Sequence, residues 1–162
     1  MSLYYNAKKY EGIEELYGRD RNNDIITSWL KICLPDRYLS AGKFDETSWC
    51  SAFIHGVFIE TYGWQAWERF VVSKDINSLA KSWKRANEGF IETQLTEAEK
   101  GDIVILDRGS KSWQGHIGFF DTHDGNHVRI LSGNVSNTVN VSRFPVRKIE
   151  NILRVEINEN LV

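Results

Sequence analysis

The stretch that begins at Asp45 constrains the fold most, because it places a cysteine directly before a long apolar segment. Asp45, Thr47 and Ser48 are residue types that cap helix N-termini, and they come just ahead of Cys50. Apolar side chains dominate the following residues until Gly63, which is a typical helix stop signal. A helix that is apolar around most of its circumference is a buried one. The sequence therefore predicts a central helix with Cys50 in its first turn.

Cys50 has two interpretations at this position. The unpaired N–H groups and the dipole of a helix N-terminus favour a thiolate, and they can lower a thiol pKa from about 8.5 by roughly a unit or more. A free cysteine is otherwise most often a small buried apolar side chain. We interpret Cys33 in this second way, because it belongs to the apolar stripe of a helix that ends before Pro35. A nucleophilic Cys50 needs a histidine from another part of the chain.

Length and charge exclude several classes of protein. The 162 residues are enough for one domain with its own core, and the formal net charge of −2 lacks the basic excess of a nucleic-acid-binding surface. No run approaches the roughly 20 apolar residues that span a bilayer. The two cysteines have neither disulfide-scaffold nor zinc-site spacing. We expect a monomer without metal or cofactor that binds no nucleic acid and does not insert into membranes.

Helical patterns fill the first part of the chain and strand patterns fill the rest. Apolar residues at three- and four-residue steps predict helices over 4–17 and 25–33, ahead of the helix of Cys50. Short apolar runs and a hairpin signal at 124–126 predict strands at 103–106, 116–120, 127–131, 138–142 and 149–157. This segregation predicts a single α+β domain over 1–162, with a helical part at 1–100 and a sheet part at 101–157.

Four histidines are candidate partners for Cys50. His55 lies five residues further along the same helix and so points to another side, and His123 and His127 flank the predicted hairpin turn. His116 instead opens a predicted strand, after a polar loop that could form one wall of a cleft. Cysteine catalysis requires a histidine that accepts and returns the thiol proton. We favour His116 for this role; the alternative is an ordinary histidine at the end of a strand.

The residue that orients the histidine could come from the next strand, where Ser132 and Asn134 lie at the predicted end. An Asn side chain can accept a hydrogen bond from one imidazole nitrogen and so fix the tautomer. The alternative is that Gly133 and Asn134 simply form a turn, since turns favour both residue types. Asp45 is a further candidate for the cleft, although helix capping explains it adequately.

Taken together, these segments resemble the CHAP group of cysteine, histidine-dependent amidohydrolases/peptidases, which are papain-like relatives of the NlpC cell-wall peptidases. The similarity covers nearly the whole chain and extends to phage and bacterial CHAP-like proteins of similar length. It rests on four segments in the expected order: DETSWCSAF at 45–53, GDIV at 101–104, GHIGFF at 115–120 and LSGNVSN at 131–137.

The resemblance implies a papain-like architecture, in which N-terminal helices pack on an antiparallel sheet. It also implies that Cys50 is the nucleophile and His116 the base. Many CHAP proteins have an acidic third residue where this chain has Ser132, and an Asn two positions later. We therefore predict Asn134 as the orienting residue, because a neutral amide can still orient an imidazole.

Two tryptophans flank the predicted catalytic residues. We predict that Trp49 and Trp113, together with Asp45, line a substrate groove; core packing is the alternative for both tryptophans.

The resemblance implies hydrolysis of amide bonds in peptidoglycan, either within the stem peptide or between sugar and peptide. The chain would act as a phage lysin or a secreted antibacterial effector. An immunity or secretion partner is possible in the second case. Because charged residues follow Met1 closely and no signal peptide is present, we expect synthesis in the cytoplasm and action at the cell wall after release or secretion. The alternatives are a non-catalytic wall-binding or phage structural protein with the same fold, and a cysteine hydrolase acting on a protein inside a target cell.

Overall fold

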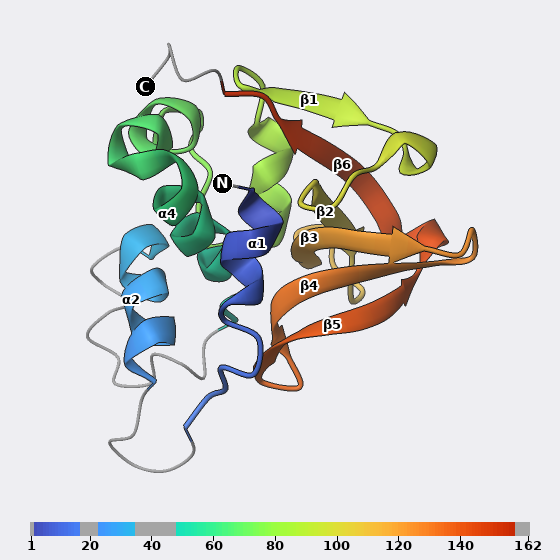
Figure 1. The fold of residues 1–162 in the computed structure, drawn as a ribbon, viewed down its shortest axis with the longest axis horizontal. Coiled ribbons are helices and arrows are strands. Elements are labelled where there is room, and N and C mark those ends of the chain that lie inside the picture. The colour runs from blue at the N-terminus through green and yellow to red at the C-terminus, as the bar shows by residue number, and fades with distance from the viewer. Residues whose placement is uncertain (1, 17–22, 35–47, 158–162) are drawn as a thin grey trace.

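The computed structural model describes residues 2–16, 23–34 and 48–157, which form a six-stranded antiparallel sheet with helices packed against it (Figure 1). The strand order is β1-β6-β2-β3-β4-β5. The helices are α1 (Leu3–Lys8), α2 (Asp24–Cys33) and α4 (Cys50–Phe70), with short 3₁₀ segments η1 (Val72–Lys74), η2 (Ala80–Arg85), η3 (Leu95–Glu97) and η4 (Val146–Lys148). The strands are β1 (Phe90–Thr93), β2 (Ile103–Asp107), β3 (Gly115–His123), β4 (His127–Val135), β5 (Thr138–Pro145) and β6 (Ile149–Val155). The α+β class is confirmed.

The continuous apolar run of β2 is explained by burial on both faces of the sheet. Ile103 and Ile105 join the large core that the helices share with the sheet. Val104 and Leu106 point to the opposite face and belong to a second, smaller apolar cluster. Because successive side chains of a strand alternate between faces, a strand covered on both sides has no polar positions.

Helix α4 is the central helix predicted from the sequence, and it lies between α2 and the sheet (Figure 1). Its first segment is buried along nearly its whole length. The predicted stop at Gly63 is a break in the helix, with φ 86° and ψ 169°, but a second helical segment then continues to Phe70. Such a backbone conformation is essentially restricted to glycine. None of the helices in the described ranges is long and apolar enough to cross a bilayer.

Two elements differ from the sequence prediction. The first helix ends at Lys8, and the chain from Gly12 instead runs beside β5, where Glu14 pairs with Thr138. Strand β1 lies inside the predicted helical part, so the predicted change of character at residue 101 comes one strand too late. Both segments are held by partners far away in the sequence, which local patterns do not reveal.

Candidate active site

Cys50 is the first residue of α4, as predicted, but the expected cap is not formed by a side chain. The N-cap residue is Trp49, which makes no capping hydrogen bond. The Ser48 hydroxyl instead lies 3.9 Å from the Cys50 sulfur. Asp45 and Thr47 lie outside the described residues. Within the described residues, the N-terminus of α4 therefore has no side-chain cap.

Burial determines the state of the Cys50 thiol. The residue is only 3% exposed, and this desolvation raises the pKa of the thiol above its ordinary value. Hydrogen bonds from Ser48 and from the backbone N–H groups of Ser51 and Ile117, and the charge of Arg108, oppose that rise without reversing it. Of the two interpretations of Cys50, the buried thiol therefore describes its pKa, because desolvation outweighs the local dipoles.

His116 lies at the start of β3 and is 1% exposed. Its Nε2 atom is 2.9 Å from the Ser132 hydroxyl of β4, whereas no hydrogen-bond partner is present for Nδ1 among the described residues. Burial, followed by the positive charge of Arg108, lowers the pKa of the imidazole to about 3. Both His116 and Cys50 are consequently neutral at neutral pH.

The thiol and the imidazole come from different elements and face different sides of the sheet: Cys50 belongs to the large core shared with the helices, whereas the His116 ring packs against Phe144 of the second cluster, with ring centroids 5.3 Å apart. The backbone of Ile117 helps to lower the pKa of the Cys50 thiol, and Ile117 directly follows His116 in the strand. The two side chains line two adjoining pockets of about 770 and 450 Å³, named here the Cys50 pocket and the His116 pocket. The pockets share Arg108, Gly109 and Asn134. The two adjoining pockets are together named the cleft.

Ser132, and not Asn134, makes the hydrogen bond that the sequence analysis assigned to the orienting residue. Residues two apart in a regular strand share a face, so both side chains were candidates. The pairing of β4 with β5 shifts between Ser132 and Val135, and Asn134 has a left-handed φ of 60°. This bulge separates the two residues: Ser132 is fully buried against His116, and Asn134 lines the cleft where the two pockets meet.

The two predicted groove tryptophans have different environments. Trp49 is fully buried, donates from its indole nitrogen to the Glu15 carboxylate at 2.7 Å, and packs near Trp29. It cannot line a groove in this conformation, so the prediction for Trp49 is wrong and core packing explains it. Trp113 is 55% exposed and lines the Cys50 pocket. A substrate-binding role for Trp113 stays a prediction, and Asp45 lies outside the described residues.

The remaining histidines lie away from this cleft. His55 is fully buried within α4, where Nδ1 accepts a hydrogen bond from Trp67 and Nε2 lies 3.0 Å from the Asn77 carbonyl oxygen. Burial lowers its pKa to about 4, so it is a neutral core residue. His123 and His127 flank the hairpin between β3 and β4. Only His116 of the four lines the cleft.

The sequence matches a known domain family. The model of the CHAP domain matches residues 42–134, which is more than half of the chain and includes Cys50, His116, Ser132 and Asn134. The chain belongs to the CHAP domain family. No curated protein sequence matches it.

A solved structure has a similar fold. The structure described as a wild-type endolysin, LysIME-EF1, is similar with a TM-score of 0.58 at 13% sequence identity. The alignment covers 98% of this chain but 65% of the endolysin chain, so this chain spans less than two thirds of that protein. At this identity the likeness establishes the fold alone.

Sequence reasoning did not single out Arg108 or Glu15, although both line the Cys50 pocket. Arg108 follows β2 in the polar loop that was expected to form a cleft wall. Its place in that loop could have identified it as a candidate. Glu15 gave no such signal, because only the pairing of its segment with β5 brings it to the cleft.

Proposed function

We propose that this CHAP chain is a cysteine hydrolase that cleaves amide bonds of peptidoglycan through an acyl-enzyme on Cys50. The observation that supports it most is the buried His116 ring, which lines a pocket adjoining that of Cys50 and has one nitrogen bonded to Ser132 and the other without a partner in the described residues. Family membership favours the same chemistry, and the structurally similar protein is an endolysin. Peptidoglycan is the substrate class that agrees with both.

The tautomer of His116 sets the direction of proton transfer. When Nε2–H donates to the Ser132 hydroxyl, Nδ1 carries the lone pair and can act as the base. Since burial favours the neutral forms of Cys50 and His116, we expect the thiol proton to move to Nδ1 as the sulfur attacks, and not in the resting enzyme.

Acyl transfer then follows in two steps. The sulfur adds to the amide carbonyl, and the backbone N–H of Cys50 at the start of α4 stabilises the oxyanion. The imidazolium of His116 returns its proton to the departing amine as the C–N bond breaks. Water, deprotonated by the same imidazole, then hydrolyses the thioester and restores the thiol. We propose that the bond is in the stem peptide or between sugar and peptide, and that the chain acts as a phage lysin or a secreted effector.

Replacement of the two reacting side chains tests this function. We expect the wild-type protein to clear a peptidoglycan suspension and to release new amino groups, and we expect Cys50→Ala and His116→Ala to abolish both. Cys33→Ala and His123→Ala are the matched controls, because each removes the same residue type from outside the cleft. Mass spectrometry of the released fragments identifies the bond.

Equal clearing by Cys50→Ala would contradict the mechanism. Binding to peptidoglycan without any release of amino groups by the wild-type protein would instead support a wall-binding or phage structural role.

A further inference from the structure

Arg108 is a cation at the centre of the cleft that has no partner among the described residues. It follows β2 directly, is exposed, and lines both the Cys50 pocket and the His116 pocket. Its charge lowers the pKa of both Cys50 and His116, the residues that line these two pockets. Within the described residues its side chain forms no hydrogen bond or ion pair. Its donors are therefore available to a ligand.

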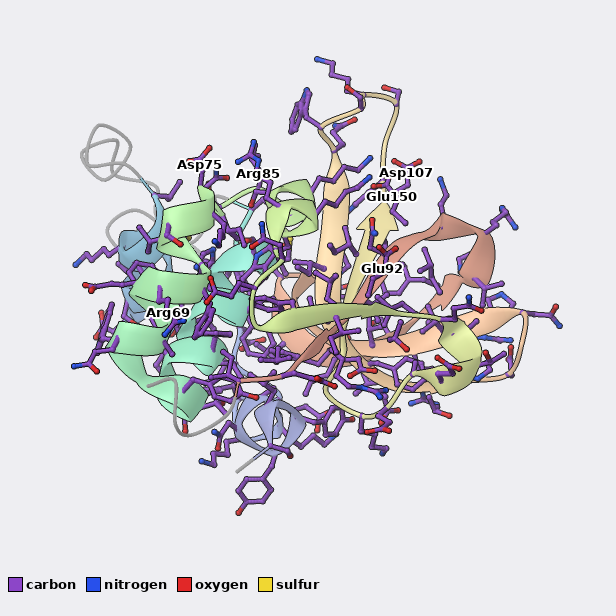
Figure 2. The ribbon with its side chains drawn as sticks, turned by 90° about the horizontal axis from the view of Figure 1, so that it is seen from above. Arg69, Asp75, Arg85, Glu92, Asp107 and Glu150 are labelled. Atoms are coloured by element: carbon purple, nitrogen blue, oxygen red, sulfur yellow. The ribbon has the colours of Figure 1, made fainter. Side chains whose placement is uncertain are left out.

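The neighbouring carboxylate Asp107 does not neutralise Arg108, because Lys81 binds it. The Lys81 ammonium is 2.7 Å from Asp107 and 2.9 Å from Glu150, and these two carboxylates lie side by side at one end of the sheet (Figure 2). Lys84 adds a further contact to Glu150 at 3.1 Å. Both acidic groups are thus bound by lysines of η2, and neither pairs with Arg108.

The His116 pocket contains a second cation together with apolar side chains. Lys148 lines it, along with Leu106, Val135, Phe144 and Pro145. The described carboxylate in this pocket is Asp107, which already binds Lys81. An apolar pocket with a cationic rim is suited to a fragment that has an aliphatic part and a carboxylate.

The chemistry determines which part of the substrate occupies this pocket. The acyl fragment becomes bonded to the Cys50 sulfur, whereas the amine fragment receives a proton from His116. The amine fragment must therefore lie on the His116 side at the moment the bond breaks. The two sides of the cleft thus receive the two halves of the cleaved amide.

We propose that Arg108 determines specificity by binding a carboxylate on the amine fragment, with Lys148 contributing charge. This inference rests on the proposed hydrolase function and narrows its substrates to amides whose leaving amine carries a nearby carboxylate. Arginine suits this task because its planar donors bind a carboxylate in two parallel hydrogen bonds.

Matched synthetic peptides test the inference. Two substrates have the same scissile amide, but the leaving residue ends in a free carboxylate in one and in a carboxamide in the other. We expect the wild-type protein to favour the carboxylate form in kcat/KM by roughly tenfold or more, as for a hydrogen bond to a charged group. Arg108→Gln should remove this preference. Lys111→Gln should retain it, since Lys111 has the same charge in the same loop but lines neither pocket.

The outcomes separate this inference from the proposed function. Equal rates for the two peptides with wild-type protein would overturn it, as would an equal loss on both peptides in Arg108→Gln, which would mean that the charge acts only on the thiol. If wild-type protein cleaves neither peptide, calorimetric binding of the same pair to Cys50→Ala decides the question. Preferential binding of the carboxylate form, lost with Arg108→Gln, supports the inference even though hydrolysis fails; equal binding overturns it.

Discussion

The hydroxyl of Ser132 is the hydrogen-bond partner of the His116 ring, at its Nε2 atom. Nε2 faces this hydroxyl at 2.9 Å, and in the proposed mechanism Nε2 holds the hydrogen and donates to the hydroxyl oxygen, which makes Nδ1 the basic nitrogen. A serine does this without adding negative charge. The imidazolium therefore receives less stabilisation than an acidic residue would give, which agrees with the low pKa of His116.

We predict that Ser132→Ala lowers kcat by roughly 10- to 100-fold and leaves KM nearly unchanged, because it affects a residue that positions the base without touching substrate. Ser132→Thr keeps the hydroxyl and should recover most of the rate. Steady-state kinetics on a defined peptide, with thermal unfolding as a check on folding, measures both. A loss confined to KM, or no recovery with threonine, would be inconsistent with a positioning role.

The sequence identified the candidate reacting residues of the site better than their surroundings. Cys50 and His116 were recognisable from a helix start and a strand start. That Ser132 rather than Asn134 is the hydrogen-bond partner of His116 was not recognisable, since it depends on a strand bulge. Nor was the burial of Trp49, because a tryptophan next to a cysteine has the same local pattern in a groove and in a core.

Helix α4 depends on two glycines for different physical reasons. At Gly56 the α2 side chain Trp29 approaches so closely that a Cβ atom would lie 2.1 Å from the indole ring. At Gly63 a Cβ would meet nothing within 4 Å, but the backbone has φ 86°. The first glycine permits the α2–α4 contact, and the second permits the break that redirects the helix.

We predict that Gly56→Ala destabilises the protein more than Gly63→Ala, although alanine favours a regular helix. Gly63→Ala should cost about 1–3 kcal/mol through backbone strain alone. Gly56→Ala adds a steric clash with a buried ring and should cost more, since overpacking of a core is itself worth about 1–3 kcal/mol and here the overlap is severe. Urea unfolding of both variants measures the difference; a larger loss at Gly63 would argue against this view of the α2–α4 contact.

Helices and strands that are defined by local sequence patterns were predicted, and those defined by contacts distant in the sequence were not. Strands β2, β3 and β4 were predicted because each contains an apolar run, and the β3–β4 hairpin has a local turn signal. The end of α1 and the short edge strand β1 were not predicted. Gly12 and Ile13 bond to Val139 in β5, and β1 pairs with β6, so long-range contacts define these segments.

Across the whole molecule, helices and sheet share one apolar core, and two buried neutral histidines lie in or beside it. His55 has a pKa of about 4 and His116 of about 3, against an ordinary value of 6.5. Between these values the unfolded chain binds protons that the folded chain does not. The contribution of the two neutral histidines to the free energy of unfolding is therefore complete above about pH 6.5, and it is lost as the pH falls toward their folded-state pKa values.

We predict that the free energy of unfolding falls steeply between pH 6.5 and 4.5, with a slope approaching about 1.4 kcal/mol per pH unit for each of the two histidines. Urea unfolding at several pH values measures this slope. His116→Gln should reduce it by about half, whereas His123→Gln should leave it unchanged, since His123 is exposed. A flat profile in the wild-type protein would show that these rings do not stay neutral in the fold.

The segment after α1 also has a consequence for association between copies. Strand β5 is an outer strand of the sheet, and residues 12–15 occupy the beginning of its free side through hydrogen bonds to Asn137 and Val139. The unpaired backbone groups of an edge strand can form hydrogen bonds with strands of neighbouring molecules. Residues 12–15 thus cover the start of this sheet edge. Without them, the exposed edge of β5 would be available for pairing with a strand from another copy of the chain.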